Sequence, residues 1–305
     1  MTDITSIANP RIKQAVKLRD SRDRRKSGMF PVDGIREILR ARESGFRIEE
    51  VFVLADQDAQ GHKRFAGCVT FERCYRERTA SFSASWVAQG MIPKSGLDFL
   101  ELLDDSKIRV WTVSPSVYEK LSFGDRDEGM IAIFHSKNYT LSELEKHLPV
   151  YPLIGVIEGV EKPGNVGAVF RSADGAGLDA MILACPGTDL FNPNIIRSSL
   201  GTVFRIPSVV ASTDEVIAWL GKKKIQTVAA ICTNASDYTQ VDYSLPTAIV
   251  LGSEAEGLSD AWLAKENFSA EYRAVKIPML GIADSLNISA AAAIEFYEAR
   301  RQRNS

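Results

Sequence analysis

Cysteine, long apolar runs and net charge are all scarce in this chain, and each shortage excludes a class of protein. The 305 residues include four cysteines and three histidines, which are scattered and lack the paired spacing of a zinc site. Four thiols are also too few for a disulfide-stabilised secreted scaffold. No apolar run reaches the roughly 18 residues that a membrane span requires, and the first residues show no signal-peptide pattern. We therefore expect a cytoplasmic protein with reduced thiols, no membrane segment and no bound metal.

The composition is that of an ordinary globular chain, with 45% hydrophobic and 25% charged residues and enough length for two domains. The net charge of −2 does not indicate nucleic-acid binding, but the charge is unevenly placed. Residues 11–26 hold eight basic residues against two acidic ones, which gives this segment a net charge of +6. A turn at Asn9-Pro10 precedes it, so residues 1–27 are predicted to form a basic N-terminal arm containing a helix. The arm is either a solvated helix face or a surface for phosphate groups.

Two α/β regions follow the arm, and a short linker separates them. In residues 28–135, a helix that begins near Ile35 and three strand-like segments indicate a small α/β domain. The segment 57–107 interrupts this domain and mixes aromatic with basic residues. We interpret it as an insertion that packs its own aromatic side chains, with a nucleic-acid-contacting loop as the alternative. Residues 136–150 are predicted to be a linker with one short helix. The strand-like segments are 48–54, 108–113 and 129–134.

Residues 151–305 carry the pattern of a parallel sheet. Their strands are continuous apolar runs that alternate with helices, which is typical of α/β domains whose sheet is covered on both faces. A glycine-rich turn and a helix follow the first strand, but the spacing differs from a dinucleotide-binding fingerprint and Pro163 lies inside the turn. A nicotinamide-dependent enzyme is therefore disfavoured. The predicted strands are 151–158, 180–184, 227–232 and 247–251, and the predicted helices are 166–176, 215–220 and 290–301.

Three phrases in this second domain combine turn residues with polar side chains. Asn-Val-Gly-Ala-Val-Phe-Arg-Ser-Ala occupies residues 165–173, and Ile-Val-Leu-Gly-Ser-Glu-Ala-Glu-Gly-Leu occupies residues 249–258. Ile-Pro-Met begins at residue 277, and Ser-Leu-Asn-Ile-Ser follows at 285–289. Ligands of parallel sheets bind at the carboxyl ends of the strands, where a glycine such as Gly252 lets a ligand approach the backbone. The second phrase therefore marks a candidate binding edge.

The polar residues of these phrases each have a structural and a chemical interpretation. Asn165 is a good helix cap. Arg171 lies among apolar residues, so its cation either extends to solvent or meets an anion. Glu254 either caps a following helical turn or points its carboxylate into a crevice. None of these residues is specific when taken alone, so the order and spacing of the phrases carry the functional argument.

Taken together, the three phrases resemble the signature motifs of the SpoU (TrmH-like) family of RNA 2′-O-ribose methyltransferases, within the SPOUT superfamily. The resemblance covers residues 151–300 and implies an α/β fold in which a SPOUT-type parallel sheet with a trefoil knot binds S-adenosylmethionine. Reasoning from topology alone would exclude such a knot, because knots are nearly absent among known folds. The resemblance also implies that residues 28–135 form a smaller, L30e-like domain that binds the RNA substrate. Members of the family are homodimers, and residues 290–297 are expected to contribute to that contact.

The resemblance also assigns a reaction and a set of site residues. The expected reaction is methylation of a ribose 2′-hydroxyl in RNA, with rRNA favoured over tRNA. A catalytically silent RNA-binding protein of the same fold is the alternative. Arg171 is expected to orient the acceptor, and the proton acceptor is a phosphate or water, Arg171 itself, or Glu254. The implied catalytic residues are Asn165, Arg171, Glu254, Ser285 and Asn287. Cofactor contacts are expected from Leu251, Gly252, Ile277, Met279, Leu286 and Asn287, and RNA contacts from Arg11, Lys13, Arg22, Arg24, Arg25 and Lys26.

Overall fold

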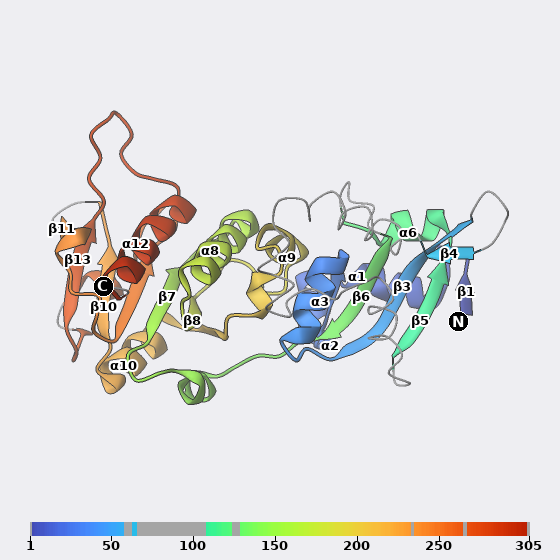
Figure 1. Ribbon diagram of the computed structural model, residues 1–305, viewed down its shortest axis with the longest axis horizontal. Helices are drawn as coiled ribbons and strands as arrows, with labels where there is room; N and C mark the ends of the chain where they lie inside the picture. Colours follow the sequence, from blue (N-terminus) through green and yellow to red (C-terminus); the bar gives the residue numbers. More distant parts are fainter. Residues whose placement is uncertain are drawn as a thin grey trace. The chain divides into compact units, whose positions relative to one another are not determined.

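Two compact units make up the chain, Met1–Ser136 and Lys137–Ser305 (Figure 1). The computed structural model describes residues 2–57, 63–65, 108–123, 129–232, 235–264 and 267–303. Most of the segment 57–107, for which the sequence predicts an insertion, lies outside the described residues. No helix within the described ranges is long and apolar enough to cross a membrane.

Unit 1 is a mixed six-stranded sheet with helices packed on it. Its elements are β1 (Thr2–Ile4), α1 (Pro10–Lys17), α2 (Ser21–Ser27), β2 (Met29–Asp33), α3 (Ile35–Glu43), β3 (Ile48–Gln57), β4 (Lys63–Phe65), β5 (Arg109–Val113), α6 (Pro115–Leu121) and β6 (Met130–His135). The strands are ordered β1-β5-β3-β6-β2, and β4 pairs with β3. β1, β5 and β3 are parallel, whereas β6 pairs antiparallel with β3 and with β2. One core cluster joins α1, α6 and the sheet through Ile12, Val117 and Phe52.

Residues 2–27 are folded into unit 1, which differs from the separate arm expected from the sequence. β1 pairs with β5, and the side chains of Ile12 and Leu18 are buried in the core that α1 shares with α6. The single helix expected here is divided into two, since Asp20 starts α2 by accepting a hydrogen bond from the Arg22 backbone N–H at 2.7 Å. The basic charge of this segment therefore lies on the surface of a packed unit.

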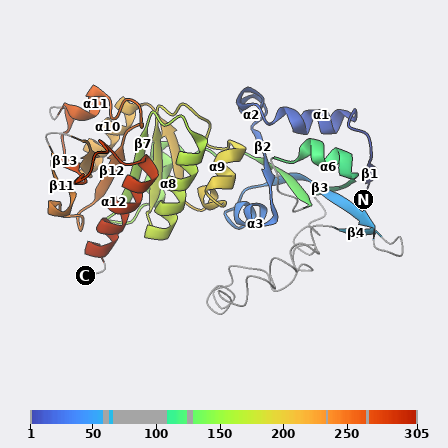
Figure 2. The ribbon, with the colours of Figure 1, turned by 90° about the horizontal axis from the view of Figure 1, so that it is seen from above.

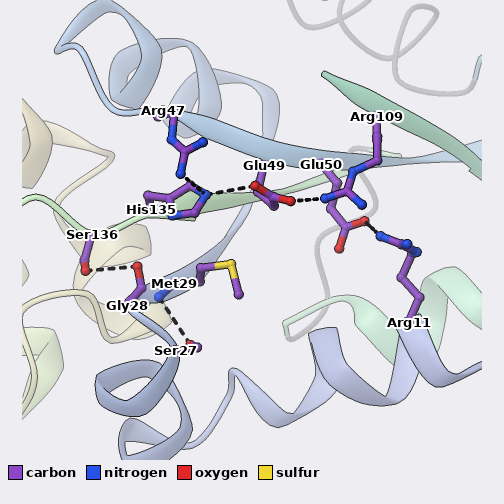
Figure 3. A network of polar contacts seen from close by, with 10 residues as sticks. All are labelled: Arg11, Ser27, Gly28, Met29, Arg47, Glu49, Glu50, Arg109, His135 and Ser136. Atoms are coloured by element: carbon purple, nitrogen blue, oxygen red, sulfur yellow. Dashed lines mark hydrogen bonds and ion pairs between the residues drawn. The ribbon is translucent and has the colours of Figure 1, made fainter. Parts of the chain in front are cut away.

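Three of the basic side chains expected to contact RNA make contacts within unit 1, and those of Arg25 are two long hydrogen bonds of 3.4 Å to Ser21 of its own helix. The guanidinium of Arg11 pairs with Glu50 at 2.6 Å (Figure 3) and lies over the Trp111 ring, 4.5 Å from its centroid. Arg24 is buried and donates to two backbone carbonyls of the preceding segment at 2.9 and 2.7 Å. Removing the side chain of Arg11 or Arg24 would therefore disturb the unit itself. The expected residues that remain exposed are Lys13, Arg22, Arg25 and Lys26.

Unit 2 is built around a seven-stranded parallel sheet, as the apolar runs of the sequence predict. Its helices are α7 (Leu141–Leu144), α8 (Pro163–Ala176), α9 (Pro193–Ser198), α10 (Thr213–Lys223), α11 (Asp260–Leu263) and α12 (Ile288–Arg303). Its strands are β7 (Leu153–Glu158), β8 (Ala180–Ala184), β9 (Ser208–Ala211), β10 (Gln226–Ala230), β11 (Ser236–Asp237), β12 (Thr247–Leu251) and β13 (Tyr272–Lys276). They are ordered β11-β13-β10-β12-β7-β8-β9, and every neighbouring pair is parallel.

Helices cover both faces of this sheet (Figure 2). On one face, Ile154 and Val156 of β7 belong to a buried cluster that also contains Trp262 of α11 and several side chains of α10. On the other face, α12 approaches β7 so closely at Gly155 that an added Cβ would lie 3.0 Å from the Phe296 ring. Successive residues of β7 therefore contact different helix layers, and all six are buried.

The predicted elements of unit 2 all correspond to observed elements, within a few residues at their ends. β8 and β12 coincide with their predictions, and α8, α10 and α12 begin a few residues before the predicted starts. β9, β11, β13 and the short helix α9 are not predicted from the sequence. β13 reads Tyr-Arg-Ala-Val-Lys, and Val275 is its only buried residue, so the strand has neither a continuous apolar run nor a clear alternation.

The strand register brings the three sequence phrases to one edge of the sheet. Ile157, Leu251 and Val275 are aligned across β7, β12, β10 and β13. The segments that follow these strands therefore leave the sheet from the same edge. At Gly252, the first residue after β12, an added Cβ would overlap the backbone of the turn that carries Glu254. Only glycine fits at this position, because the turn folds back tightly against the strand end.

Candidate active site

Segments that leave the carboxyl edge of the sheet bring Asn165, Glu254 and Asn287 together. Asn165 lies in the first turn of α8, shortly after β7. Glu254 lies in the tight turn after β12, which a pair of backbone hydrogen bonds closes at 3.1 and 3.0 Å. Asn287 precedes α12, and its Oδ1 accepts hydrogen bonds from the backbone N–H and hydroxyl of Ser289 at 2.9 and 2.6 Å. These bonds fix the amide of Asn287 in a single orientation.

The carboxylate of Glu254 is the centre of this cluster. Its Oε1 accepts hydrogen bonds from the side-chain amide of Asn165, at 2.8 Å, and from that of Asn287. Its Oε2 accepts a hydrogen bond from the ammonium of Lys162 at 2.8 Å. The Nδ2 of Asn287 also lies 3.4 Å from the Oδ1 of Asn165. One carboxylate thus joins residues that are 89 and 33 positions away from it in the sequence.

These donors favour the ionised form of Glu254. The hydrogen bond from Lys162 is the main reason that the pKa of the Glu254 carboxyl lies below its usual range, and the amide of Asn165 adds to the effect. The same pair raises the pKa of the Lys162 ammonium. A carboxylate with a lowered pKa is a weak base. The geometry therefore favours Glu254 as the anchor of the two amides over Glu254 as a proton acceptor.

Arg171 and Ser285 are not joined to this cluster by hydrogen bonds among the described residues. Arg171 lies six positions after Asn165, or about 9 Å further along α8, and its side chain is exposed. Its guanidinium has neither a hydrogen-bond nor an ion-pair partner in the part of the chain that the structure describes. A guanidinium is always charged at physiological pH. Arg171 is therefore available to an anionic or hydroxyl-bearing ligand without breaking a protein contact.

The residues expected to contact the cofactor lie at the same carboxyl edge. Leu251 is buried at the end of β12, and Gly252, Ile277, Met279 and Leu286 are partly exposed. Gly252 and Ile277 follow β12 and β13, which are separated by β10 alone. At about 4.8 Å between neighbouring strands, these two strand ends are about 10 Å apart. The structure thus places all five residues on three segments of one sheet edge.

The connection between β13 and α12 carries two apolar side chains in full contact with solvent. It projects beyond the other elements of unit 2 (Figure 1), and the side chains of Leu280 and Ile282 are 99% and 103% exposed. Two fully exposed apolar side chains on one projecting connection make it a candidate contact surface for a ligand or partner.

Two charged residues of this edge are not predicted from the sequence. One is Lys162, and the other is Glu158, the last residue of β7. The buried carboxylate of Glu158 accepts hydrogen bonds from the Thr213 hydroxyl at 2.5 Å and from the Ser259 N–H and hydroxyl at 2.8 and 2.9 Å. It thereby fixes the starts of α10 and α11. Both residues lie shortly before the first phrase, but their partners are distant in sequence, so no local pattern identifies them.

Comparison with known proteins agrees with this arrangement. A model of the SpoU rRNA Methylase family matches residues 152–297, and a model of the MRM3-like substrate binding domain matches residues 9–132. The 23S rRNA (uridine(2479)-2′-O)-methyltransferase of Streptomyces viridochromogenes is 31% identical over 211 residues, which are 67% of this chain and 71% of that protein. A solved structure of an RNA 2′-O ribose methyltransferase is 34% identical, with a TM-score of 0.73 and full coverage of both chains. The structure of the AdoMet-bound rRNA methyltransferase from Sinorhizobium meliloti is 26% identical, with a TM-score of 0.75 over 98% of this chain and 97% of that one.

The parallel sheet, the cluster at its carboxyl edge and these similarities define an RNA 2′-O-ribose methyltransferase. The chain belongs to the SpoU family. The family resemblance carried by the three sequence phrases is thereby confirmed. The match of the N-terminal domain model begins at residue 9, so it includes the whole basic segment 11–26. This agrees with the packing of that segment into unit 1.

Proposed function

We propose that the protein transfers the methyl group of S-adenosylmethionine to a ribose 2′-hydroxyl in rRNA. The observation that carries this proposal is the cluster of Glu254, Asn165 and Asn287 at the carboxyl edge of a SpoU-type sheet. The related Sinorhizobium meliloti structure is an rRNA methyltransferase with bound AdoMet. Relatives from Streptomyces viridochromogenes and Bacillus subtilis are 23S rRNA 2′-O-methyltransferases. These relatives favour rRNA over tRNA as the substrate.

The chemistry of the sheet edge fits S-adenosylmethionine. Ile277, Met279 and Leu286 offer partly exposed apolar surface that suits an adenine ring, and the strand ends offer backbone groups for its polar atoms. When bound, the sulfonium supplies a methyl group that is already activated, so the transfer requires no metal. We assign cofactor binding to Leu251, Gly252, Ile277, Met279, Leu286 and Asn287.

Arg171 and the Glu254 cluster have different roles in aligning the acceptor. In this proposal Arg171 donates hydrogen bonds to the 2′-oxygen and the adjacent phosphate, which holds the hydroxyl in line for attack. Asn165, Asn287 and Ser285 shape the space around the reacting atoms. The proton leaves through a phosphate or a water molecule, with Arg171 as direct base the alternative. The lowered pKa of Glu254 weakens its carboxylate as a base.

We also propose a separate role for each unit and a dimeric state for the protein. Unit 1 would bind the RNA as an L30e-like domain, and residues 151–305, after the linker at 136–150, would form the knotted catalytic domain of a cytoplasmic homodimer. The match of unit 1 to a substrate binding domain supports the first assignment. The exposed Tyr297 of α12 and the exposed apolar side chains of the β13–α12 connection support a contact with a second copy. The knot rests on the family resemblance.

The direct test of the reaction uses the purified protein with RNA from a strain that lacks it. rRNA and tRNA would be incubated separately with S-adenosylmethionine carrying a labelled methyl group. We expect label in rRNA, in 2′-O-methylnucleosides and in alkali-resistant linkages. Label in tRNA alone would mean that the substrate is tRNA and not rRNA. RNA binding without any transfer of label would favour the alternative, a catalytically silent RNA-binding protein.

Leu286→Asp is expected to weaken S-adenosylmethionine binding at least about 10-fold, because it places a charge in a partly buried apolar contact. Calorimetric titration of the cofactor measures the effect. The matched control is Leu263→Asp, which changes an exposed leucine of α11 in the same unit. An equal loss of affinity in both variants, or none in Leu286→Asp, would remove Leu286 from the cofactor site.

Neutralising the exposed basic side chains of α1 and α2 is expected to weaken RNA binding and flatten its salt dependence. Each phosphate that is no longer neutralised by a basic side chain reduces the slope of log affinity against log salt by about 0.7 to 0.9. The test is RNA binding over a salt series by a variant in which four side chains are replaced by glutamine, namely Lys13, Arg22, Arg25 and Lys26.

Deletion of residues 1–27 would not be a fair test of this surface, because it removes the buried Ile12 and Leu18 from the core of unit 1. A suitable control neutralises Lys222 and Lys224, which are exposed on α10 and at its end. An unchanged salt slope in the four-residue variant would show that this surface of unit 1 does not meet phosphates.

A further inference from the structure

Lys162 occupies a position at which a lysine side chain does not stabilise the fold. It is the N-cap residue of α8, where Ser, Thr, Asp or Asn stabilise a helix by bonding to its free N–H groups, and its side chain makes no such bond. Its positive charge also lies at the positive end of the helix dipole, which is unfavourable. Pro163 at the first helical position sets the start of α8 without help from the lysine side chain. The reason for a lysine at this position must therefore lie elsewhere.

The side chain of Lys162 contributes to the Glu254 cluster instead. Its Nζ lies 2.8 Å from the Oε2 of Glu254, although the side chain is 74% exposed. An ion pair this exposed adds little to stability. It does, however, engage the one carboxylate oxygen that the amides of Asn165 and Asn287 leave unused, because both amides donate to Oε1. The carboxyl group thus has a cation on one oxygen and two amides on the other, and the Ile288 backbone N–H also donates to it.

We propose that Lys162 is a positioning residue for methyl transfer, which orients the Glu254 carboxylate so that its Oε1 holds Asn165 and Asn287 in place. This inference rests on the proposed function of the cluster. Without the ammonium, Oε2 has no charged donor, so the carboxylate can shift on its remaining hydrogen bonds and turn this oxygen toward water. The two amides would then lose their common acceptor, and the reacting end of the site would lose its alignment. The lowered pKa of Glu254 is consistent with this role.

The position of Lys162 allows a test in which stability and activity change in opposite directions. Lys162→Ser places a good N-cap on α8, so the melting temperature is expected to stay equal or to rise. The same change is expected to lower kcat roughly 10- to 100-fold, the effect of a small misalignment. The KM values for cofactor and RNA should stay within about 3-fold, because Lys162 is proposed to act through Glu254. Lys162→Arg keeps the charge and should recover much of the activity.

The matched control is Lys223→Ser. Lys223 forms an ion pair with Glu145 in the same unit, away from the carboxyl edge of the sheet. Loss of the Lys223 side chain should leave kcat unchanged. A fall in kcat of similar size in both variants, or a fall in melting temperature that accounts for the loss in Lys162→Ser, would overturn the proposal.

A second measurement does not depend on the methylation reaction. In protein carrying 13C-labelled glutamate carboxyls, the signal of Glu254 is identified by its absence in Glu254→Gln and followed over pH. In Lys162→Ser the pKa of Glu254 should move up toward its ordinary value, and the acid side of the kcat profile should move up with it. An unmoved Glu254 titration, or a loss confined to the KM for RNA, would contradict a positioning role. The wild-type protein could methylate no RNA while the pKa of Glu254 still rises in Lys162→Ser. In that case the proposed function fails, but the contact between Lys162 and Glu254 is confirmed.

Discussion

Arg171→Ala is expected to reduce methyl transfer about 1,000-fold or more, while S-adenosylmethionine binds within a few fold of its wild-type affinity. A preorganised donor aimed at the reacting oxygen is worth about 100- to 1,000-fold in kcat, and Arg171 is also proposed to hold the adjacent phosphate. The side chain is exposed and has no hydrogen-bond or ion-pair partner among the described residues of unit 2, so its removal should not alter the fold. Single-turnover methylation and calorimetric cofactor binding measure the two effects separately.

Arg171→Lys should recover little of this activity, because an ammonium cannot make the paired donor contacts of a guanidinium. The control is Arg205→Ala, which removes an exposed arginine that lies 3.9 Å from Asp174 of α8. This variant should retain its activity. Lost cofactor binding with intact turnover at saturating cofactor would reverse the assignment of Arg171 to the acceptor.

Glu295→Leu is expected to stabilise unit 2 increasingly as the pH rises from about 5 to about 8. The Glu295 side chain is fully buried in α12, and neither carboxyl oxygen has a hydrogen-bond partner among the described residues. Burial raises the pKa of this carboxyl to about 8. The nearby Tyr243 hydroxyl is also buried, and burial together with the Glu295 charge raises the pKa of that phenol. Glu295 is therefore protonated and neutral in the folded protein below about pH 8.

The direction of the pH effect follows from the raised pKa. In the unfolded chain Glu295 ionises near its ordinary value of 4.5, whereas in the folded chain it keeps its proton up to about pH 8. The contribution of this group to the stability of the wild-type protein is therefore greatest below pH 4.5 and is lost progressively as the pH rises toward 8. At 1.36 kcal/mol per pKa unit, the effect amounts to up to about 5 kcal/mol. Glu295→Leu removes this dependence.

Thermal unfolding of the variant and the wild type between pH 5 and 9 measures the effect as a difference, which cancels the titration of other groups. Glu298 supplies the control, because its hydrogen bonds to Arg301 lower the pKa of its carboxyl. Its contribution is lost only in acid, so Glu298→Gln should differ from the wild type by a constant amount over this range. A constant difference for Glu295→Leu as well would show that Glu295 does not ionise in this window.

The sequence predicts most of the sheet of unit 2 and the residues of the Glu254 cluster, and it does so for two separate reasons. β8 and β12 are buried on both faces, so they appear as continuous apolar runs whatever their neighbours are. Asn165, Glu254 and Asn287 are identified through the order and spacing of family phrases. Their residue types alone do not distinguish a helix cap from a site residue. The structure supplies the distances between them.

What the sequence could not predict depends on contacts between distant segments. The basic residues of α1 give the same pattern whether they face solvent or an acidic partner, and the pairing of Arg11 with Glu50 appears only in the fold. β13 is a strand because β10 and β11 bond to it, while its own residues show no clear period. Lys162 belongs to the site because the turn after β12 returns to the start of α8, which no local pattern reveals.

The order of strands in unit 2 has a consequence for how the active enzyme is made. β7, β8 and β9 are neighbours both in sequence and in the sheet, so they can pair as soon as they leave the ribosome. β7 must then keep its other edge open until β12 is synthesised and pairs Thr247 with Leu153. Such non-local, parallel pairing slows folding and leaves an unpaired strand edge exposed during synthesis. Asn287 lies after β13, so it can reach Glu254 only when most of unit 2 has been synthesised, and the Glu254 cluster is among the last parts of the unit to form.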